Sequence, residues 1–464
     1  MSTTHTVAPR IMISGARKSS GKTTLSIGLT AALTQRGFVV QPYKKGPDFI
    51  DPLWLSRASG RACRNLDFFI MGQEMVLRSF LNPLSDADFC LIEGNLGLFD
   101  GQDLEGNDCG AALAATLKTP VILVVNCQGM ARGVAPLIQG HLTFPGGDII
   151  AGVILNNVAS PRQEGRLRAA VERYCDIPVV GALPRSKDVV IDERHLGLTP
   201  VTEGDQLPQR IRAIGEHVAQ HIDLDTVIDI ANLAPQWQYT PVQSEVCTQN
   251  GQGLTIGYAL DQAFHFYYPE NLEALQRRGV SLVPIDFLKA DKLPEVDGLF
   301  IGGGFPEMFM DQLAANRTLM DDIRAQSMAG LPIYAECGGL MALANTIYWQ
   351  KKSAQLAGAL PIEITMHKKP QGYGFMQIRS TGKTAWPPQG VVCNCHEFHY
   401  SSITRITKPL DRAYEVVRGT GVDGLTDGIL YRNILASYAH IHHLGAPGWV
   451  DFLIDFWRKK ATVT

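Results

Sequence analysis

The stretch Gly15-Ala16-Arg17-Lys18-Ser19-Ser20-Gly21-Lys22-Thr23-Thr24 lies between an apolar run at 10–14 and a helical pattern over 24–36 that ends at Gly37. In such a turn, backbone amides and the N-terminus of the following helix bind phosphate oxygens. Lys22 is expected to reach the β- and γ-phosphates of a nucleotide, and Thr23 to hold Mg²⁺. The stretch therefore predicts a phosphate-binding loop that contacts ATP through Gly15, Ser19, Ser20, Gly21, Lys22, Thr23 and Thr24.

Short apolar runs continue along the chain at 38–43, 89–93, 121–125 and 149–155, with helical patterns between them. Apolar strands that alternate with helices predict a mostly parallel sheet covered on both faces. A polar stretch then precedes a second α/β pattern, with strands expected at 254–259, 280–284, 298–301 and 331–335. We therefore expect two α/β domains, an ATP-binding P-loop domain over 1–235 and a second domain over 253–464, joined by a linker at 236–252.

Carboxylates that follow the first-domain strands are candidates to complete a metal site. Asp48 and Asp51 come just after the second strand, and Glu93 ends the third. Ligands bind at the carboxyl ends of strands in open α/β sheets, and Mg²⁺ prefers few carboxylates plus phosphate oxygens and waters. We predict Thr23, Asp48 and Glu93 as the Mg²⁺ ligands. The alternative is that the acids cap helices or lie in turns, which suits Glu93 least because a charge that ends an apolar strand needs a partner.

A cysteine in the second half lies at an expected strand-to-helix turn, Ile333-Tyr334-Ala335-Glu336-Cys337-Gly338-Gly339. Such an elbow is expected to expose the thiol, and the helix N-terminus to lower its pKa. A thiolate that attacks an amide also needs a base and oxyanion donors. The base candidate is His440, with His442 and His443 as rivals, and the donor candidates are Gly303, Gly304 and Gly338. The alternative is a buried cysteine that only packs as a small hydrophobe.

Another segment, Cys393-Asn394-Cys395-His396-Glu397-Phe398-His399-Tyr400, contains potential metal ligands. Zinc sites usually combine two ligand pairs, and no second pair stands out. We expect an ordered loop near the active site there rather than a metal site.

The composition excludes several classes of protein. The chain has 464 residues and a net charge of −3, which gives no general attraction to nucleic acid or anionic membranes. Its apolar runs are too short to span a bilayer, and its N-terminus lacks the features of a signal peptide. Its nine cysteines have no regular spacing and are expected to be reduced thiols. We expect a cytoplasmic protein without nucleic-acid or membrane partners.

Taken together, the motifs resemble those of the cobyrinic acid a,c-diamide synthases, which belong with the dethiobiotin-synthetase-like P-loop amidoligases. The resemblance covers nearly the whole chain, and the five residues between Gly15 and Gly21 are the spacing that these relatives use. The matching segments are 45–51, 64–67, 93–101, 193–198, 261–272, 302–307, 335–340, 396–401 and 437–442.

The resemblance implies that the first domain binds ATP and Mg²⁺ and phosphorylates a side-chain carboxylate of a tetrapyrrole. It implies that the second is a class I glutamine amidotransferase domain, with Cys337 as nucleophile and His440 as base. Ammonia from L-glutamine then displaces phosphate, which amidates the a and c acetate groups of cobyrinic or hydrogenobyrinic acid in cobalamin biosynthesis. Lys45, Asp51 and Asp100 are the candidate contacts to this substrate.

Some positions depart from the common patterns. Ala335 replaces the first glycine of Gly-x-Cys-x-Gly, and His442 stands where a glutamate often follows the histidine, so the group that orients His440 stays open. Residues 52–56 and 95–96 also differ, which leaves sirohydrochlorin, its nickel form or sirohaem as alternative substrates. A P-loop regulator and a tetrapyrrole carrier without turnover are alternatives from other classes. The oligomeric state stays open, with a homodimer as one option.

Overall fold

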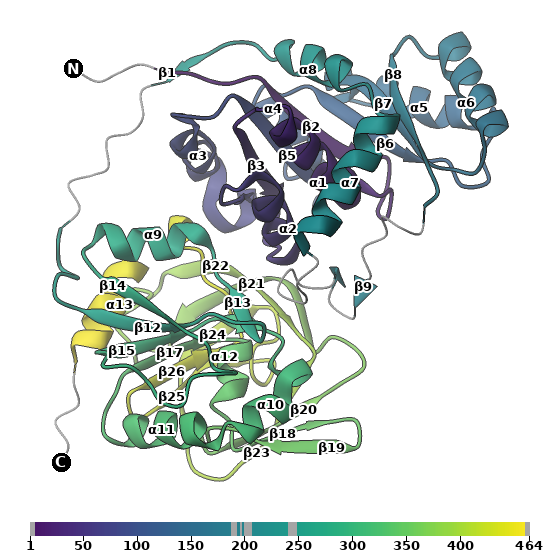
Figure 1. Cartoon of the computed structure of the whole chain (residues 1–464). Helices are drawn as coiled ribbons and strands as arrows, with labels where there is room; N and C mark the ends of the chain where they lie inside the picture. The colour runs from purple at the N-terminus through teal and green to yellow at the C-terminus, as the bar shows by residue number, and fades with distance from the viewer. Residues whose placement is uncertain (1–4, 187–192, 195–196, 199–206, 240–247, 460–464) are drawn as a thin grey trace. The chain divides into compact units, whose positions relative to one another are not determined.

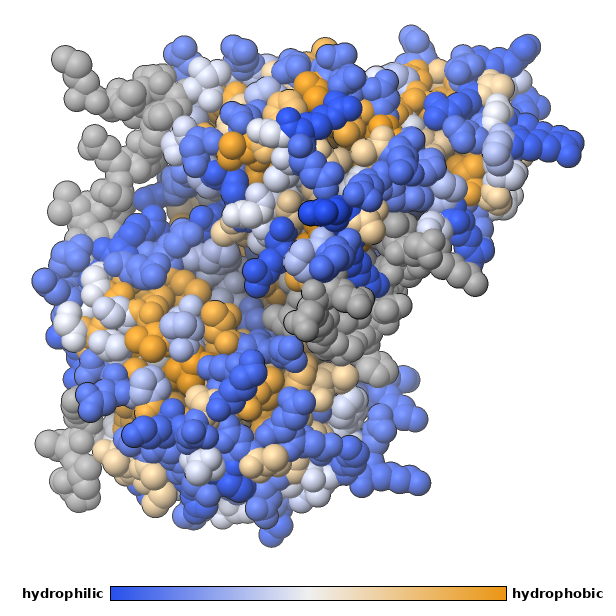
Figure 2. Space-filling view, viewed as in Figure 1, coloured by the Kyte–Doolittle hydropathy of each residue, from blue (hydrophilic) through white to orange (hydrophobic). Residues whose placement is uncertain are grey.

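The computed structural model describes residues 5–186, 193–194, 197–198, 207–239 and 248–459. The chain forms two compact units, Met1–Phe68 with Gln73–Gln243 and Phe69–Gly72 with Ser244–Thr464. Each unit contains its own large sheet (Figure 1). Hydrophilic residues cover most of the visible face of both units (Figure 2). Within the described ranges, no helix is both long enough and apolar enough to cross a bilayer.

The first unit is built on a seven-stranded sheet in which all neighbouring strands are parallel, as the alternation of strands and helices predicts. The expected strands are present, with ends that differ by one to four residues. In spatial order the strands are β4 Arg64–Leu66, β3 Val40–Lys45, β5 Phe89–Gly97, β2 Arg10–Gly15, β6 Val121–Asn126, β7 Ile150–Val158 and β8 Val179–Pro184.

Helices connect these strands, as parallel neighbours require. Helix α1 Lys22–Gln35 packs against β2, and α7 Leu207–His221 packs against α1; Ile13, Leu29 and Val218 belong to the apolar cluster that these elements share. Gly28 lets the two helices approach, because a Cβ there would lie 2.3 Å from Val218 Cγ2. The helices are α1 Lys22–Gln35, α2 Ile50–Ser59, α3 Phe68–Leu81, α4 Gly110–Thr116, α5 Val134–Thr143, α6 Pro161–Tyr174, α7 Leu207–His221 and α8 Leu224–Asn232.

Short strands complete the first unit. β1 His5–Thr6 pairs with β11 Gln238–Tyr239, and β9 Glu193–Arg194 pairs with β10 Gly197–Leu198. The expected linker at 236–252 therefore includes an ordered strand of the first unit, and its residues 240–247 lie outside the described residues. So do His195 and Leu196 of the segment 193–198 that the family resemblance includes.

The second unit is built on a nine-stranded mixed sheet. Its first five strands are parallel, and the remaining four continue the sheet in antiparallel pairs. In spatial order they are β14 Ser281–Ile285, β12 Thr255–Ala259, β15 Gly298–Ile301, β17 Ile333–Glu336, β26 Ile434–Ser437, β25 Thr426–Tyr431, β24 Asp411–Arg418, β21 Gly372–Ser380 and β22 Val392–His399.

Two smaller sheets and five helices complete the described part of this unit. The sheets consist of β19 Lys352–Gln355, β18 Thr346–Trp349, β20 Ile362–Met366 and β23 Ser401–Ile406, and of β13 Phe264–Phe266 with β16 Gly303–Gly304. The helices are α9 Pro269–Arg277, α10 Met310–Ala315, α11 Arg317–Met328, α12 Gly338–Ala342 and α13 Trp449–Arg458.

One local prediction is wrong. The segment 393–400 is not a loop, because residues 392–399 form β22 and pair along their length with β21. Most side chains of this strand are buried, among them Cys393, Cys395, His396, Glu397 and His399. Nowhere in the described ranges do three or more His, Cys, Asp or Glu side chains form a group that could hold a metal ion.

Candidate functional site

The phosphate-binding loop joins β2 to α1 and has a fixed backbone shape. Gly21 caps the helix in the left-handed region, with φ 88° and ψ 20°. The side-chain amide of Asn156 donates a hydrogen bond to Ser20 O at 2.8 Å, and a Cβ on Gly21 would lie only 2.0 Å from that nitrogen. Inside the loop, Ser20 Oγ donates to Arg17 O at 2.7 Å. Only glycine fits at position 21, so the loop reaches the helix N-terminus in the geometry that binds anions.

Three predicted nucleotide contacts, Lys22, Thr23 and Thr24, occupy the first turn of α1. Lys22 is buried, and its ammonium donates to the carbonyl of Leu96 at 2.6 Å. Burial, followed by the charge of Lys44, lowers the pKa of Lys22. Ser19 adopts φ 59° and is exposed. The lysine that is expected to contact the terminal phosphates therefore lies at the carboxyl edge of the sheet.

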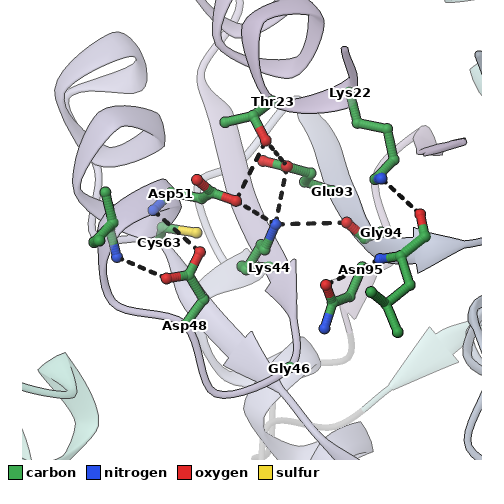
Figure 3. A network of polar contacts seen from close by, with 12 residues as sticks. Lys22, Thr23, Lys44, Gly46, Asp48, Asp51, Cys63, Glu93, Gly94 and Asn95 are labelled. Carbon is green, nitrogen blue, oxygen red and sulfur yellow. Dashed lines mark hydrogen bonds and ion pairs between the residues drawn. The ribbon is translucent and has the colours of Figure 1, made fainter. Parts of the chain in front are cut away.

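A network of charged groups lies beside this turn (Figure 3). The hydroxyl of Thr23 donates to Glu93 Oε1 at 2.6 Å and to Asp51 Oδ2 at 3.3 Å. The ammonium of Lys44 lies 2.5 Å from Asp51 Oδ2 and 2.9 Å from Glu93 Oε1. Burial opposes the charge on Lys44, but Asp51, Glu93 and Asp48 together outweigh it and raise the pKa of the lysine. The site thus holds one buried cation among three acids.

Lys44 was missed by the sequence analysis, which selected Lys45. Lys44 and Glu93 are register partners on β3 and β5, and parallel partners place their side chains on the same face of a sheet. Lys45 is the next residue of β3 and is half-buried. When β3 and β5 are aligned as parallel neighbours, the side chain of Lys44 lies on the same face of the sheet as that of Glu93. This alignment would have identified Lys44 from the sequence.

Asp48 lies outside the innermost contacts of the network. Its two carboxylate oxygens accept hydrogen bonds from the backbone N–H groups of Ile50 and Asp51, at 3.0 and 3.3 Å, at the start of α2. Burial, and then the neighbouring Asp51 charge, raises the pKa of Asp48 to about 8. Asp48 thus occupies a helix-capping position, whereas Asp51 contacts Thr23 directly.

The residues around Thr23 fit a magnesium ion that is bound together with nucleotide phosphates. Glu93 is fully buried, and its Oε2 has no hydrogen-bond partner among the described residues. Burial raises the pKa of Glu93 to about 6. A buried carboxylate oxygen without a donor is suited to a cation, and Mg²⁺ needs only one or two carboxylates besides phosphate and water.

The remaining substrate candidate, Asp100, lies in the turn that follows β5. Its Oδ2 accepts a hydrogen bond from the backbone N–H of Gly97 at 2.9 Å, and its side chain is exposed. Leu98 N in turn donates to Gly15 O at 2.8 Å, which ties this turn to the phosphate-binding loop. Asp100 therefore lies at the same edge of the sheet as Lys22.

The cysteine elbow is present in the second unit. Cys337 follows β17 and precedes α12, with φ 46° and ψ −99°. Its backbone N–H donates to Ser437 O at 2.7 Å, and its thiol donates to Phe398 O at 3.7 Å. A non-glycine residue with positive φ is strained, and such strain is held where the surrounding structure fixes it.

The environment of the Cys337 thiol contradicts the expectation that the thiol is exposed and that its pKa is lowered. Cys337 is buried rather than exposed, and burial, followed by the charge of Glu307, raises its pKa. The following helix α12 has only five residues, so its dipole is small and does not offset the burial. The thiol of the free protein is therefore protonated at neutral pH.

The predicted oxyanion glycines lie next to the elbow. A Cβ on Gly338 would lie 2.9 Å from the backbone nitrogen of Gly304. A Cβ on Gly303 would lie 2.7 Å from Cε1 of His440. The loop of Gly303 and Gly304 thus lies between Gly338 and His440. Glycine is required at positions 338 and 303, where a side chain would approach these neighbours too closely.

Two of the three candidate histidines have a glutamate within ion-pair distance, whereas His443 is half-buried and its backbone N–H donates to Asn271 Oδ1 at 2.8 Å. His440 Nδ1 lies 3.5 Å from Glu336 Oε2, and its backbone pairs with that of His396. His442 Nε2 lies 3.7 Å from Glu270 Oε2 and packs against the ring of Tyr268. The ring of His440 lies next to Gly303 in the predicted oxyanion loop. This position favours His440 over His442 and His443 as the base.

The chain is similar to known proteins over nearly its whole length. Residues 11–198 match the family model of the CobQ/CobB/MinD/ParA nucleotide binding domain, and residues 255–447 match that of the CobB/CobQ-like glutamine amidotransferase domain. The chain is 57% identical over 458 residues to the cobyrinate a,c-diamide synthase of Magnetococcus marinus, covering 98% of each chain. It is 39% identical over 437 residues to that of Archaeoglobus fulgidus, covering 94% of each.

A solved structure of a glutamine amidotransferase aligns with 44% of this chain and 98% of its own length, at 16% identity and a TM-score of 0.33. The two family models correspond to the two kinds of domain that the motifs predict.

Proposed function

This chain belongs to the cobyrinate a,c-diamide synthase family, and from that premise we propose that it uses ATP and L-glutamine to amidate the a and c acetate carboxylates of cobyrinic acid or hydrogenobyrinic acid. The reaction is that of a carbon–nitrogen ligase in cobalamin biosynthesis. The observation that carries the proposal is the 57% identity to the Magnetococcus marinus cobyrinate a,c-diamide synthase over 98% of both chains.

The first unit activates the carboxylate. An acetate oxygen of the tetrapyrrole attacks the γ-phosphorus of ATP, the bond to the β-phosphate oxygen breaks, and an acyl phosphate and ADP form. The loop amides and Lys22 bind the phosphates and stabilise the charge that develops during transfer. Thr23 and Glu93, with Asp51 rather than the predicted Asp48, would hold Mg²⁺, which would neutralise phosphate charge. Asp48 accepts a hydrogen bond from the backbone N–H of Asp51 and so helps to position Asp51.

The second unit releases ammonia. The thiol of Cys337 transfers its proton to His440 while the sulfur attacks the side-chain amide carbon of glutamine. The loop of Gly303 and Gly304, with Gly338, provides backbone donors for the oxyanion. His440 then protonates the leaving nitrogen, the carbon–nitrogen bond breaks, and water hydrolyses the thioester to glutamate.

Ammonia completes the ligation. Its nitrogen attacks the acyl carbon of the acyl phosphate, phosphate leaves, and a proton is released, which gives the amide. The same sequence at the second acetate consumes one further ATP and one further glutamine. Lys45 and Asp100 are proposed to contact the tetrapyrrole, since they lie at or near the carboxyl edge of the first sheet, whereas Asp51, the third predicted contact, is assigned to Mg²⁺.

The test is to incubate the purified protein with ATP, Mg²⁺ and glutamine, with cobyrinic acid and sirohydrochlorin in parallel, and to analyse the products by mass spectrometry. Two amides on cobyrinic acid are expected. Amidation in the sirohydrochlorin series alone would assign the enzyme to another tetrapyrrole pathway. Unchanged carboxylates on both compounds would contradict the ligase function and favour a carrier or a regulator.

We also propose a cytoplasmic location, which the sequence analysis expects, and a homodimer, which it leaves as one option. Light scattering after size-exclusion chromatography tests the second point, for which a mass of twice 50.7 kDa is expected.

A further inference from the structure

The residue directly before the nucleophile contacts the predicted base. Oε2 of Glu336 lies 3.5 Å from Nδ1 of His440, and both side chains are almost fully buried, with 4% and 2% of their surfaces exposed. A separation of 3.5 Å is an ion-pair distance rather than a tight hydrogen bond. Hydrogen bonds of catalytic groups are often long in free enzymes and shorten when substrate binds.

The other oxygen of Glu336 is fixed by two donors. Tyr334 Oη donates to Oε1 at 2.8 Å, and the backbone N–H of Ile441 donates to it at 3.3 Å. The second donor belongs to the residue that follows His440. Strand pairing reinforces this arrangement, because Glu336 and Ser437 are register partners on β17 and β26. Glu336 is therefore fixed next to residues 437–441, the segment that includes His440.

The ring of His440 is also held from other sides. Its backbone N–H donates to His396 O at 2.8 Å, and the two imidazoles stack with centroids 4.8 Å apart. Burial, followed by the charges of His440 and His442, lowers the pKa of His396 well below its usual range. His396 is therefore neutral, and Glu336 lies within ion-pair distance of His440.

We propose that Glu336 is the positioning residue for His440 in the glutamine reaction, an inference that rests on the glutamine amidotransferase function proposed above. The carboxylate orients the ring so that Nδ1 faces Glu336 and Nε2 is the nitrogen that exchanges protons. It also stabilises the imidazolium that forms when the thiol of Cys337 loses its proton. In this chain it takes the role of the acid that commonly follows the histidine by two positions, where His442 stands.

Glu336→Gln tests this assignment, because glutamine keeps the size of the side chain and removes its charge. Orientation and charge stabilisation of a general base contribute about 100-fold or more to rate. We expect kcat with glutamine to fall roughly 100-fold, while amidation with free ammonia keeps its rate. KM for glutamine should stay near the wild-type value, because Glu336 contacts the base rather than the substrate.

A matched control is Glu270→Gln, which removes the acid of another buried histidine–glutamate pair, Glu270 with His442. It should leave kcat with glutamine at the wild-type value. A second variant, Tyr334→Phe, removes one of the two donors that fix Glu336. It should lower kcat with glutamine by roughly 10-fold, about the loss of one hydrogen bond to a charged group, and it decides the question if Glu336→Gln does not fold.

The outcomes separate the inference from the proposed function. If Glu336→Gln or Tyr334→Phe retains the wild-type kcat with glutamine, while Cys337→Ala loses use of glutamine, the role of Glu336 is wrong and the function stands. If Cys337→Ala also retains use of glutamine, the proposed function is wrong. If Glu270→Gln lowers kcat with glutamine and Glu336→Gln does not, His442 and Glu270 are the working pair.

Discussion

Lys44 and Glu93 are register partners on the neighbouring strands β3 and β5, and their side chains form a buried ion pair at 2.9 Å. The same ammonium also lies 2.5 Å from Asp51 Oδ2. Two of the acids around the phosphate-binding loop thus depend on one lysine for neutralisation. Removing this cation leaves carboxylates in an apolar interior, where an uncompensated charge is costly.

Lys44→Met should therefore lower the free energy of unfolding by about 3–5 kcal/mol, the usual cost of removing one partner of a buried pair. Urea denaturation measures this change. Lys45→Met is the matched control, since Lys45 is only half-buried and forms no ion pair with any described residue; it should change stability by about 0.5 kcal/mol or less. Equal stability of the two variants would show that the buried pair contributes little.

Asp48 should make the protein less stable as the pH rises. Its pKa is about 8 in the folded chain against 3.8 for the unfolded residue, so the folded state binds the proton more tightly. The resulting stabilisation is complete below pH 4 and is lost as the pH rises through 8. Asp48→Asn does not ionise, and its urea midpoint should fall less than that of the wild type between pH 5 and 8.

The control for this titration is Asp103→Asn, because Asp103 is exposed and its pKa is lowered by hydrogen bonds from Asn107. Asp103 is ionised in the folded and the unfolded chain between pH 5 and 8. Its replacement should therefore leave the change of the urea midpoint with pH as it is in the wild type. If the urea midpoint changes with pH equally in Asp48→Asn and in the wild type, the pKa of Asp48 is not raised in the folded chain.

Lys22→Ala should stop amidation with either nitrogen source, because the loss of a donor to the transferred phosphate costs roughly 100-fold or more in rate. Product formation with glutamine and with ammonium chloride measures the effect. Lys18→Ala is the control, since Lys18 is exposed in the same loop. Retained ligation with ammonia in Lys22→Ala would contradict the role of the lysine.

Cys337→Ala should abolish glutamine-dependent amidation and leave amidation with free ammonia, because the nucleophile acts only in the release of nitrogen. Mass spectrometry of the tetrapyrrole product measures both reactions. Loss of both activities in a folded variant would contradict separate sites for the two half-reactions.

Gly303→Ala should lower kcat/KM for glutamine at least 10-fold and leave the ammonia reaction intact. The added methyl group would lie 2.7 Å from Cε1 of His440, so the ring or the loop has to move, and small displacements of catalytic groups have large effects on rate. Gly165→Ala is the control, since a Cβ there meets no atom within 4 Å. Wild-type kinetics of Gly303→Ala would show that His440 does not depend on this contact.

The sequence predicts the strands of the first unit well, because runs such as 121–125 are apolar throughout and have no other stable location than a buried sheet. It also identifies Glu93, whose charge ends such a run. It does not identify Lys44, since its importance depends on the register between β3 and β5 rather than on a local pattern.

The same reason explains two features of the second unit. The proximity of Glu336 and His440 comes from the pairing of β17 with β26, whose sequences lie about a hundred residues apart. The raised pKa of Cys337 comes from tertiary packing around the elbow, whereas a local motif suggests only the effect of the helix N-terminus. Local patterns thus locate the reactive residues, and long-range packing decides their protonation.

The burial of the Cys337 thiol has a consequence for oxidative damage. Hydrogen peroxide attacks thiolates, and successive oxidation to sulfinic and sulfonic acids is irreversible for most enzymes. A thiol that burial keeps protonated between turnovers offers peroxide little reactive sulfur. The same packing that raises the pKa of the Cys337 thiol therefore limits its oxidation while glutamine is absent.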